Sequence, residues 1–457
     1  MIFPLSIVSL LGLVCIGLLA SPYPFLAPGA VLGLVGFAVL YRKPTWGLLG
    51  IAALVPFEGF FKDTSFSGSK LIGASLAVIL MLQLALHQIP SERLRSNIWR
   101  YLVWFMVLYF LSLLNTDDMG MSLGHLRELS VGLILFVITL LIGRELNLDL
   151  FARLVTLAVS TTCAMAMFST KFQDQGRAAG LLEDPNAFAL LIAFAVPMGL
   201  LLVIRSPNLL HRLFWGGCCL LLLGGMTKTE SRSGLVVLAL SLLIGCWHYR
   251  TQLTRIRPRH LGFAMLGAAI VIPLAIYAMP AGYLARIQSL SVLSAGAKGH
   301  NDESLGRRAS YIVVGSQMIR ENPLLGSGPG TFPLHYATTG YAKAFSANRK
   351  IGDLYRRAHN TYLEIFSELG VPAGLLFVGM LGLGLYNLIR ARAAWMLRGN
   401  SYQTDLMTHL GVSFLSLTLF LMFLSAPNQK YVWIMLAMTS VLRLKAEQAP
   451  LSTEAKA

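Results

Sequence analysis

Residues 187–204 read AFALLIAFAVPMGLLLVI and carry no charge over eighteen consecutive positions. A helix rises about 1.5 Å per residue, so about 20 such residues cross the hydrocarbon core of a bilayer. Comparable apolar blocks recur near residues 2–20, 24–41, 46–57, 71–88, 101–114, 127–142, 152–168, 213–226, 235–247, 261–279, 362–389, 407–425 and 431–444. The pattern predicts an all-α polytopic membrane protein with about 12–14 transmembrane helices, of which the short block at 46–57 could instead be re-entrant or interfacial.

The composition supports a membrane protein. Hydrophobic residues make up 55% of the 457 positions and charged residues only 13%, whereas a soluble domain carries roughly 25% charged residues. Residues 1–20 lack a basic start and continue through Ser21-Pro22 into the next apolar block. We therefore expect a first span there and no cleaved signal peptide. The five cysteines lie in apolar blocks without metal-ligand spacing, which predicts buried thiols.

Short basic loops set the expected orientation. They follow five of the apolar blocks, at residues 42–43, 91–100, 205–212, 250–259 and 390–398. Because Lys and Arg concentrate in cytoplasmic loops, these loops and both termini are expected in the cytoplasm. The same loops explain much of the net charge of +16, which therefore does not indicate a nucleic-acid partner. Counting crossings then places outside the segments 58–70, 115–123, 169–186, 227–234, 280–360 and 426–430.

This orientation divides the chain into five parts. They are N-terminal transmembrane helices (1–175), transmembrane helices with short outer loops (176–279), one large outer loop (280–360), C-terminal transmembrane helices (361–444) and a cytoplasmic tail (445–457).

The large outer loop, residues 280–360, is strongly basic. It holds ten Lys or Arg and four acidic residues. Lys and Arg are usually in excess in cytoplasmic loops, so a strongly basic outer loop is unusual and indicates an anionic partner. Within it, residues 304–320 predict an amphipathic interfacial helix that ends at Asn322-Pro323. The glycine-rich stretch 326–330 predicts a turn with many free amides.

His359 stands at the end of this loop, directly before the apolar block at 362–389. Asn360 or Thr361 can cap that helix, whose N-terminal amides favour anions. A histidine changes protonation near neutral pH, so His359 is the candidate general base. Arg356 and Arg357 add full positive charges beside it, and Arg357 is the candidate anion ligand. The alternative is that His359 is only an interfacial residue and that the neighbouring arginines bind lipid headgroups.

Two shorter outer loops also contain arginine. Arg232 lies between two apolar blocks with almost no linker, where a charge is costly unless it is paired or faces water. Pairing with Glu230 or snorkelling would explain it without a site. Asp184-Pro185-Asn186 is typical of a helix start, and this explains the acid and the amide but leaves Arg177 unexplained.

Together these residues predict an arginine-lined site on the outer face. Its members are His359, Arg177, Arg232, Arg307, Arg308 and Arg357. Arginine binds phosphate and diphosphate through paired hydrogen bonds, so a lipid-linked diphosphate fits such a site at the membrane surface. The sequence has no clean acidic triad and no paired histidines, and we therefore expect neither a metal nor a cofactor.

Four motifs resemble the O-antigen ligase and polymerase superfamily of bacterial polysaccharide assembly. They are GRAAGLLEDPN (176–186), SRSGL (231–235), RENPLLGSGPGTF (320–332) and AHNTYLEIFSELG (358–370), in the order and spacing of that family. The resemblance implies about 12 helices with one large periplasmic loop between late spans. It also implies transfer of a glycan from an undecaprenyl diphosphate carrier at the periplasmic face of the bacterial inner membrane, without metal or nucleotide sugar.

The resemblance also assigns roles to individual residues. It implies that His359 is the base and that Arg232, with Arg308 or Arg307, holds the diphosphate. Arg177 joins the set only by its charge and position.

The implied enzyme is an inverting, O-antigen ligase-like glycosyltransferase that acts on lipid A–core. Other members of the superfamily polymerise O-antigen or exopolysaccharide on the carrier, or transfer glycans to protein hydroxyls, and these alternatives stay open. A transporter of lipid-linked glycans is the rival from another class. It predicts charges deep in several spans or duplicated halves, whereas the polar residues here cluster in outer loops and no repeat is visible.

Overall fold

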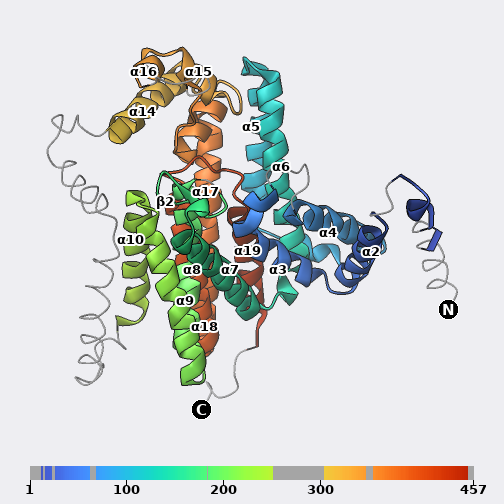
Figure 1. Cartoon of the computed structure of the whole chain (residues 1–457). Coiled ribbons are helices and arrows are strands. Elements are labelled where there is room, and N and C mark those ends of the chain that lie inside the picture. The colour runs from blue at the N-terminus through green and yellow to red at the C-terminus, as the bar shows by residue number, and fades with distance from the viewer. Residues whose placement is uncertain are drawn as a thin grey trace.

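The computed structural model describes residues 12–13, 16–22, 26–61, 68–182, 184–250, 303–345 and 354–450. This part of the chain is almost entirely helical (Figure 1). The strands found in it are β1 (Gln173–Asp174) and β2 (Arg177–Ala178), which pair antiparallel. The predicted all-α polytopic class is confirmed.

Six of the described helices are long and apolar enough to cross a membrane. They are α4 (Gly68–Ala85), α6 (Met119–Ile142), α7 (Leu148–Phe168), α8 (Pro185–Arg205), α9 (Leu209–Lys228) and α17 (Thr361–Leu397). Shorter apolar helices are α2 (Leu26–Arg42), α5 (Trp99–Ser112) and α10 (Arg232–His248). The total of about 12–14 spans stays a prediction. The block at 261–279 and most of the block at 2–20 lie outside the described residues.

The short third block forms α3 (Pro44–Leu54), an 11-residue helix followed by the 3-10 turn η1 (Val55–Phe61). The C-terminal blocks form α18 (Ser401–Phe420) and α19 (Lys430–Gln448). Helix starts follow from local capping. The Asp184 carboxylate accepts from the Asn186 amide at 2.7 Å ahead of α8, and Asn360 accepts from the Leu363 amide at 3.1 Å ahead of α17. Both caps were predicted from the sequence.

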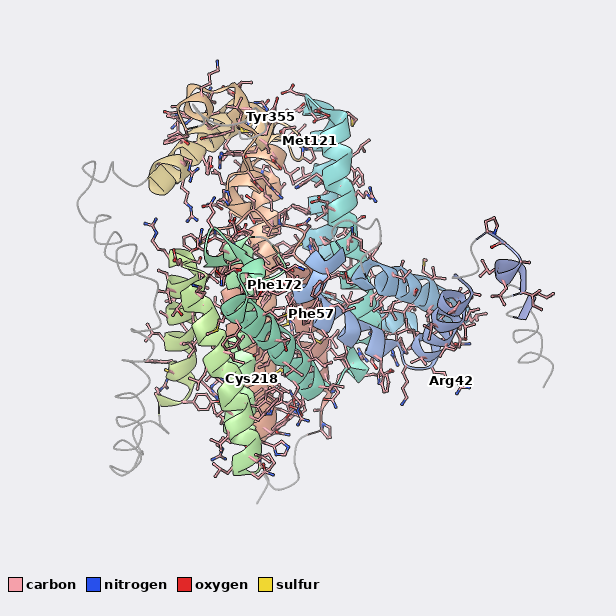
Figure 2. The ribbon with its side chains drawn as sticks, in the orientation of Figure 1. Arg42, Phe57, Met121, Phe172, Cys218 and Tyr355 are labelled. Carbon is pink, nitrogen blue, oxygen red and sulfur yellow. The ribbon has the colours of Figure 1, made fainter. Side chains whose placement is uncertain are left out.

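Helix α17 is the central element of the bundle, packed against α5, α18 and α19 along its length. Helix α8 packs against α7, α9, α10 and α18, and its residues from Phe188 to Gly199 are all buried. A helix that is apolar all round is expected at such an interior position. The thiols of Cys163, Cys218 and Cys219 are buried as predicted, and Figure 2 shows Cys218 on α9. Cys246 is exposed, so the prediction was wrong there.

An outer layer covers the N-terminal end of α17 (Figure 1). It consists of α14 (Glu303–Glu321), α15 (Phe332–Thr338) and α16 (Gly340–Ala344). The predicted helix at 304–320 is therefore confirmed as α14. A second apolar core, which includes Tyr311, Phe332, Tyr336 and Ala358, holds the layer together. Gly315 of α14 packs closely on α17, because a Cβ there would lie 2.7 Å from the Leu363 side chain.

The glycine-rich stretch 326–330 does not present free amides, contrary to the prediction. Helix α17 is broken at Gly370, where φ is 87° and ψ is 168°. At this break the Ser327 and Gly328 amides donate to main-chain oxygens of α17, at 3.2 and 2.9 Å. The buried Glu368 carboxylate accepts from the amides of Gly330 and Phe332 at 2.8 and 3.1 Å. The amides complete the broken helix end instead, since its carbonyls need donors.

Candidate active site

A pocket of about 150 Å³ lies where the outer layer meets the starts of α8 and α10. Its walls are formed by Arg177, Asn186, Arg307, Arg308, Tyr311, Arg356 and His359. Four of these side chains are guanidinium groups, and none is a carboxylate. We call these seven residues the basic pocket. Arginines that share one small, partly enclosed space favour an anion with several oxygens.

Three separate parts of the chain build the basic pocket. Arg307, Arg308 and Tyr311 project from adjacent turns of α14, since residues three and four apart share a helix face. His359 arrives from the loop before α17. Arg177 sits on β2 and donates from Nε to the Thr229 carbonyl at 2.9 Å, which ties this strand to the end of α9.

His359 has a positive φ of 48°, a backbone conformation that non-glycine residues seldom adopt. Its ring lies near that of Tyr311, with 6.0 Å between centroids. The conformation follows from the tight turn between Ala358, buried in the outer core, and Asn360, which caps α17. Residues held in such a sparsely populated backbone conformation cluster at functional sites.

The surroundings of His359 favour a neutral imidazole. Burial lowers the pKa of His359, and the positive charges of Arg308 and Arg356 lower it further, against the opposing charges of Asp184 and Glu364. A neutral ring can accept a proton, which a general base requires. Burial also raises the pKa of the neighbouring Tyr311, so this hydroxyl stays protonated and able to donate.

Arg357 is not part of the basic pocket. Its Nε and Nη2 donate to the carboxylate of Glu364 at 3.3 and 3.0 Å, and the Glu364 side chain is 2% exposed. Burial works against the charged form of Arg357, but Glu364 outweighs it and raises the Arg357 pKa. The neighbouring Arg356 lines the pocket instead.

Arg232 is the first residue of α10 and is half-buried, but it does not line the basic pocket. Its neighbour Ser231 donates to Asn186, with 2.9 Å between Oγ and Oδ1, and Asn186 is a pocket residue. The structure thus brings His359, Arg177, Arg307 and Arg308 together, places Arg232 next to them and directs Arg357 elsewhere.

The predicted set of site residues lacks three residues of the pocket, Tyr311, Arg356 and Asn186. Of these, Arg356 was expected beside the site as a charge but not as a ligand. Tyr311 could have been found from its spacing to Arg307 and Arg308 on the predicted helix. Asn186 was interpreted only as a helix-start residue. The choice between Arg356 and Arg357 had no sequence signal, because it depends on where the loop backbone turns.

No group of three or more His, Cys, Asp and Glu side chains that could hold a metal ion occurs among the described residues. The expectation of a metal-free reaction stays a prediction.

Fold and site together define a multi-pass helical membrane protein. At one end of its helix bundle it has a pocket of arginines around His359, and this pocket suits an anionic substrate held in the membrane. Residues 217–378 match the family model described as O-Antigen ligase. This confirms the resemblance to the O-antigen ligase and polymerase superfamily, and indicates an enzyme of the glycosyltransferase or ligase type. No curated protein matches the chain. The matched segment contains His359 and every predicted arginine except Arg177.

Proposed function

We propose that the protein is an O-antigen ligase-like glycosyltransferase. It transfers a glycan from an undecaprenyl diphosphate carrier to a hydroxyl of lipid A–core, at the periplasmic face of the bacterial inner membrane. The observation that carries the proposal is one juxtaposition. His359 shares a pocket with four arginines, and its pKa is lowered by burial and by two of them.

The arginines are the proposed ligands of the diphosphate. Arg307 and Arg308 enter the pocket from α14, Arg356 enters from the loop before α17, and Arg177 enters from the bundle side. Guanidinium groups stabilise the negative charge that develops on the diphosphate as its bond to the sugar breaks. Arg232 follows Ser231, whose hydroxyl donates to the pocket residue Asn186, and it would contact a donor that extends toward α10.

His359 is the proposed base for the acceptor. Its ring nitrogen removes the proton from an acceptor hydroxyl, and that oxygen attacks the anomeric carbon of the carrier-linked sugar. The bond between this carbon and the diphosphate oxygen breaks, and undecaprenyl diphosphate leaves. Attack on the face opposite the leaving group inverts the anomeric configuration. The proton stays on His359 until product departs, and the arginines supply the leaving-group stabilisation without a metal.

The deciding experiment is incubation of the purified, reconstituted protein with a defined undecaprenyl diphosphate glycan and three acceptors in separate reactions. We expect the glycan on lipid A–core. A longer carrier-linked chain would instead identify a polymerase, and glycan on protein Ser or Thr would identify an oligosaccharyltransferase. Movement of intact donor across a sealed bilayer, with no product on any acceptor, would identify a transporter and overturn the proposal.

A further inference from the structure

A large cavity lies far from the basic pocket. Its volume is about 830 Å³, and it opens between the end of α10, the last third of α17 and the first half of α18. Helix α10 begins beside Asn186 of the basic pocket and ends at His248 of this cavity. Seventeen residues at 1.5 Å separate the two by roughly 25 Å, close to the thickness of a bilayer core. The cavity therefore lies at the opposite membrane face.

One wall of the cavity is a polar network. Arg392 donates to His248 Nδ1 from Nη2 at 2.8 Å, and its Nε also donates to Thr408 Oγ1 at 3.1 Å. Because arginine only donates, Nδ1 accepts, and His248 Nε2 carries the hydrogen that it donates to Asp405 at 2.9 Å. The Asp405 carboxylate also forms an ion pair with Arg205.

The network leaves positive charge at the cavity. Arg392 has no anionic partner in it, and no hydrogen bond within the described residues uses its Nη1. Arg250 stands at the rim with its guanidinium 4.4 Å from the Trp247 ring. The charged side chains that line the cavity are Arg250, Arg392 and Asp405, and Asp405 is already paired with Arg205. The polar wall therefore suits a phosphate oxygen.

The remaining walls are apolar. Leu385, Leu388 and Ile389 line the cavity from α17, and Leu415 lines it from α18. Ile389 is 63% exposed, so the apolar surface continues outward toward the lipid. Hydrocarbon chains fit such walls while a phosphate reaches the arginines, and a cavity of this size is in the range of ligand pockets.

We propose that this cavity binds an anionic glycerophospholipid, with its phosphate at Arg392 and its acyl chains along α17 and α18. The inference is independent of the proposed glycan transfer. It assigns a lipid site to the membrane face opposite the basic pocket.

The test uses native mass spectrometry of the full chain in detergent, titrated with phosphatidylglycerol, phosphatidylcholine or inorganic phosphate. We expect phosphatidylglycerol to bind more tightly than phosphatidylcholine and not to be displaced by inorganic phosphate. Arg392→Gln should weaken phosphatidylglycerol binding by about tenfold, because a charged hydrogen bond is lost. Arg390→Gln is the matched control, since Arg390 is exposed on the same helix and does not line the cavity.

A second variant leaves the polar network untouched. Gly411 lines the cavity, and a Cβ there would meet only Leu388, at an ordinary contact distance of 3.9 Å, so Gly411→Leu should extend a side chain into the cavity. It should also lose phosphatidylglycerol, whereas Gly382→Leu, at an exposed glycine of α17 with open space around it, should not. Equal binding of both lipids, displacement by inorganic phosphate, or undiminished binding by Gly411→Leu would each overturn the proposal.

Discussion

The buried carboxylate of Glu364 lies 3.0 Å from Nη2 of Arg357 and 2.9 Å from the backbone nitrogen of Ala358. It thereby binds both residues that precede His359. The turn that gives His359 its φ of 48° is held by an acid on the helix that follows. Glu364 does not line the basic pocket, so we regard it as a positioning residue.

Glu364→Gln should therefore slow glycan transfer mainly through kcat. The amide keeps the shape of the side chain but loses the charge that holds Arg357, and a misplaced base costs up to about 10²-fold. Steady-state kinetics in proteoliposomes with the carrier-linked donor measures this. Glu321→Gln, at an exposed acid of α14, is the control and should leave kcat unchanged. An unaltered kcat in Glu364→Gln would remove its positioning role.

His359→Gln should reduce glycan transfer by about 10²–10⁴-fold, the usual contribution of a general base. Donor binding should change little, because the arginines of the basic pocket remain. His335→Gln is the matched control, since His335 belongs to the same outer layer and pairs with Asp117 at 3.5 Å, outside the pocket. Full activity of His359→Gln in membrane vesicles would eliminate the base role.

Substitutions of the adjacent Arg356 and Arg357 should have different effects, on donor binding and on stability respectively. Arg356→Gln should raise the donor KM by about tenfold with little change in thermal midpoint, because a charged ligand is lost from the pocket. Arg357→Gln should lower the thermal midpoint, because Glu364 would stay buried without its cation. Donor titrations and thermal unfolding of both variants check this. The same donor KM in Arg356→Gln and the parent protein would exclude Arg356 as a ligand.

The pH dependence of glycan transfer should shift in opposite directions in two variants of residues near His359. Burial, Arg308 and Arg356 lower the pKa of His359, so the acid limb of kcat/KM should lie below the usual histidine range. Arg308→Gln removes a positive charge, raises the pKa of His359 and should move that limb to higher pH. Asp184→Asn removes a negative charge and should move it to lower pH, while asparagine still caps α8. Limbs that shift in the same direction would contradict His359 as the titrating group.

The break in α17 should be sensitive to a single methyl group. Gly370 has φ 87°, and a Cβ there would lie 2.3 Å from the Leu324 carbonyl oxygen. Gly370→Ala should lower the free energy of unfolding by about 1–3 kcal/mol through backbone strain alone. Gly382→Ala, in the regular part of the same helix with open space around it, should be neutral or stabilising. Thermal unfolding in detergent compares the two, and equal midpoints would argue against the strained junction.

Several features of the site could be predicted because they depend on nearby residues. Asn360 caps α17 and Asp184 caps α8, since a cap needs only a side-chain oxygen within three residues. Helix α14 followed from its own apolar periodicity and the Asn322-Pro323 stop. His359 and Arg308 were found from charge beside a helix start and from the family motifs.

Other features depended on partners distant in sequence. The glycine-rich stretch near Gly328 was expected to offer free amides, but the broken end of α17 occupies them. Arg357 was expected in the pocket, but it faces Glu364, and Arg356 faces the pocket. One residue of offset reverses the direction of a side chain in an extended loop, and only the folded backbone sets that offset.

The amino-acid sequence by itself determined that this is a helical, multi-pass membrane protein. The free energy of transferring a segment into a bilayer is the sum over its own residues, so a local apolar block such as 187–204 is enough to predict a span. It also determined that the segment 280–360 is basic and carries His359 next to its end. Only the tertiary structure decided which arginines share a pocket with that histidine. That choice depends on the packing of α14 on α17 through Gly315 and Leu363, and on Glu364 buried beneath the loop.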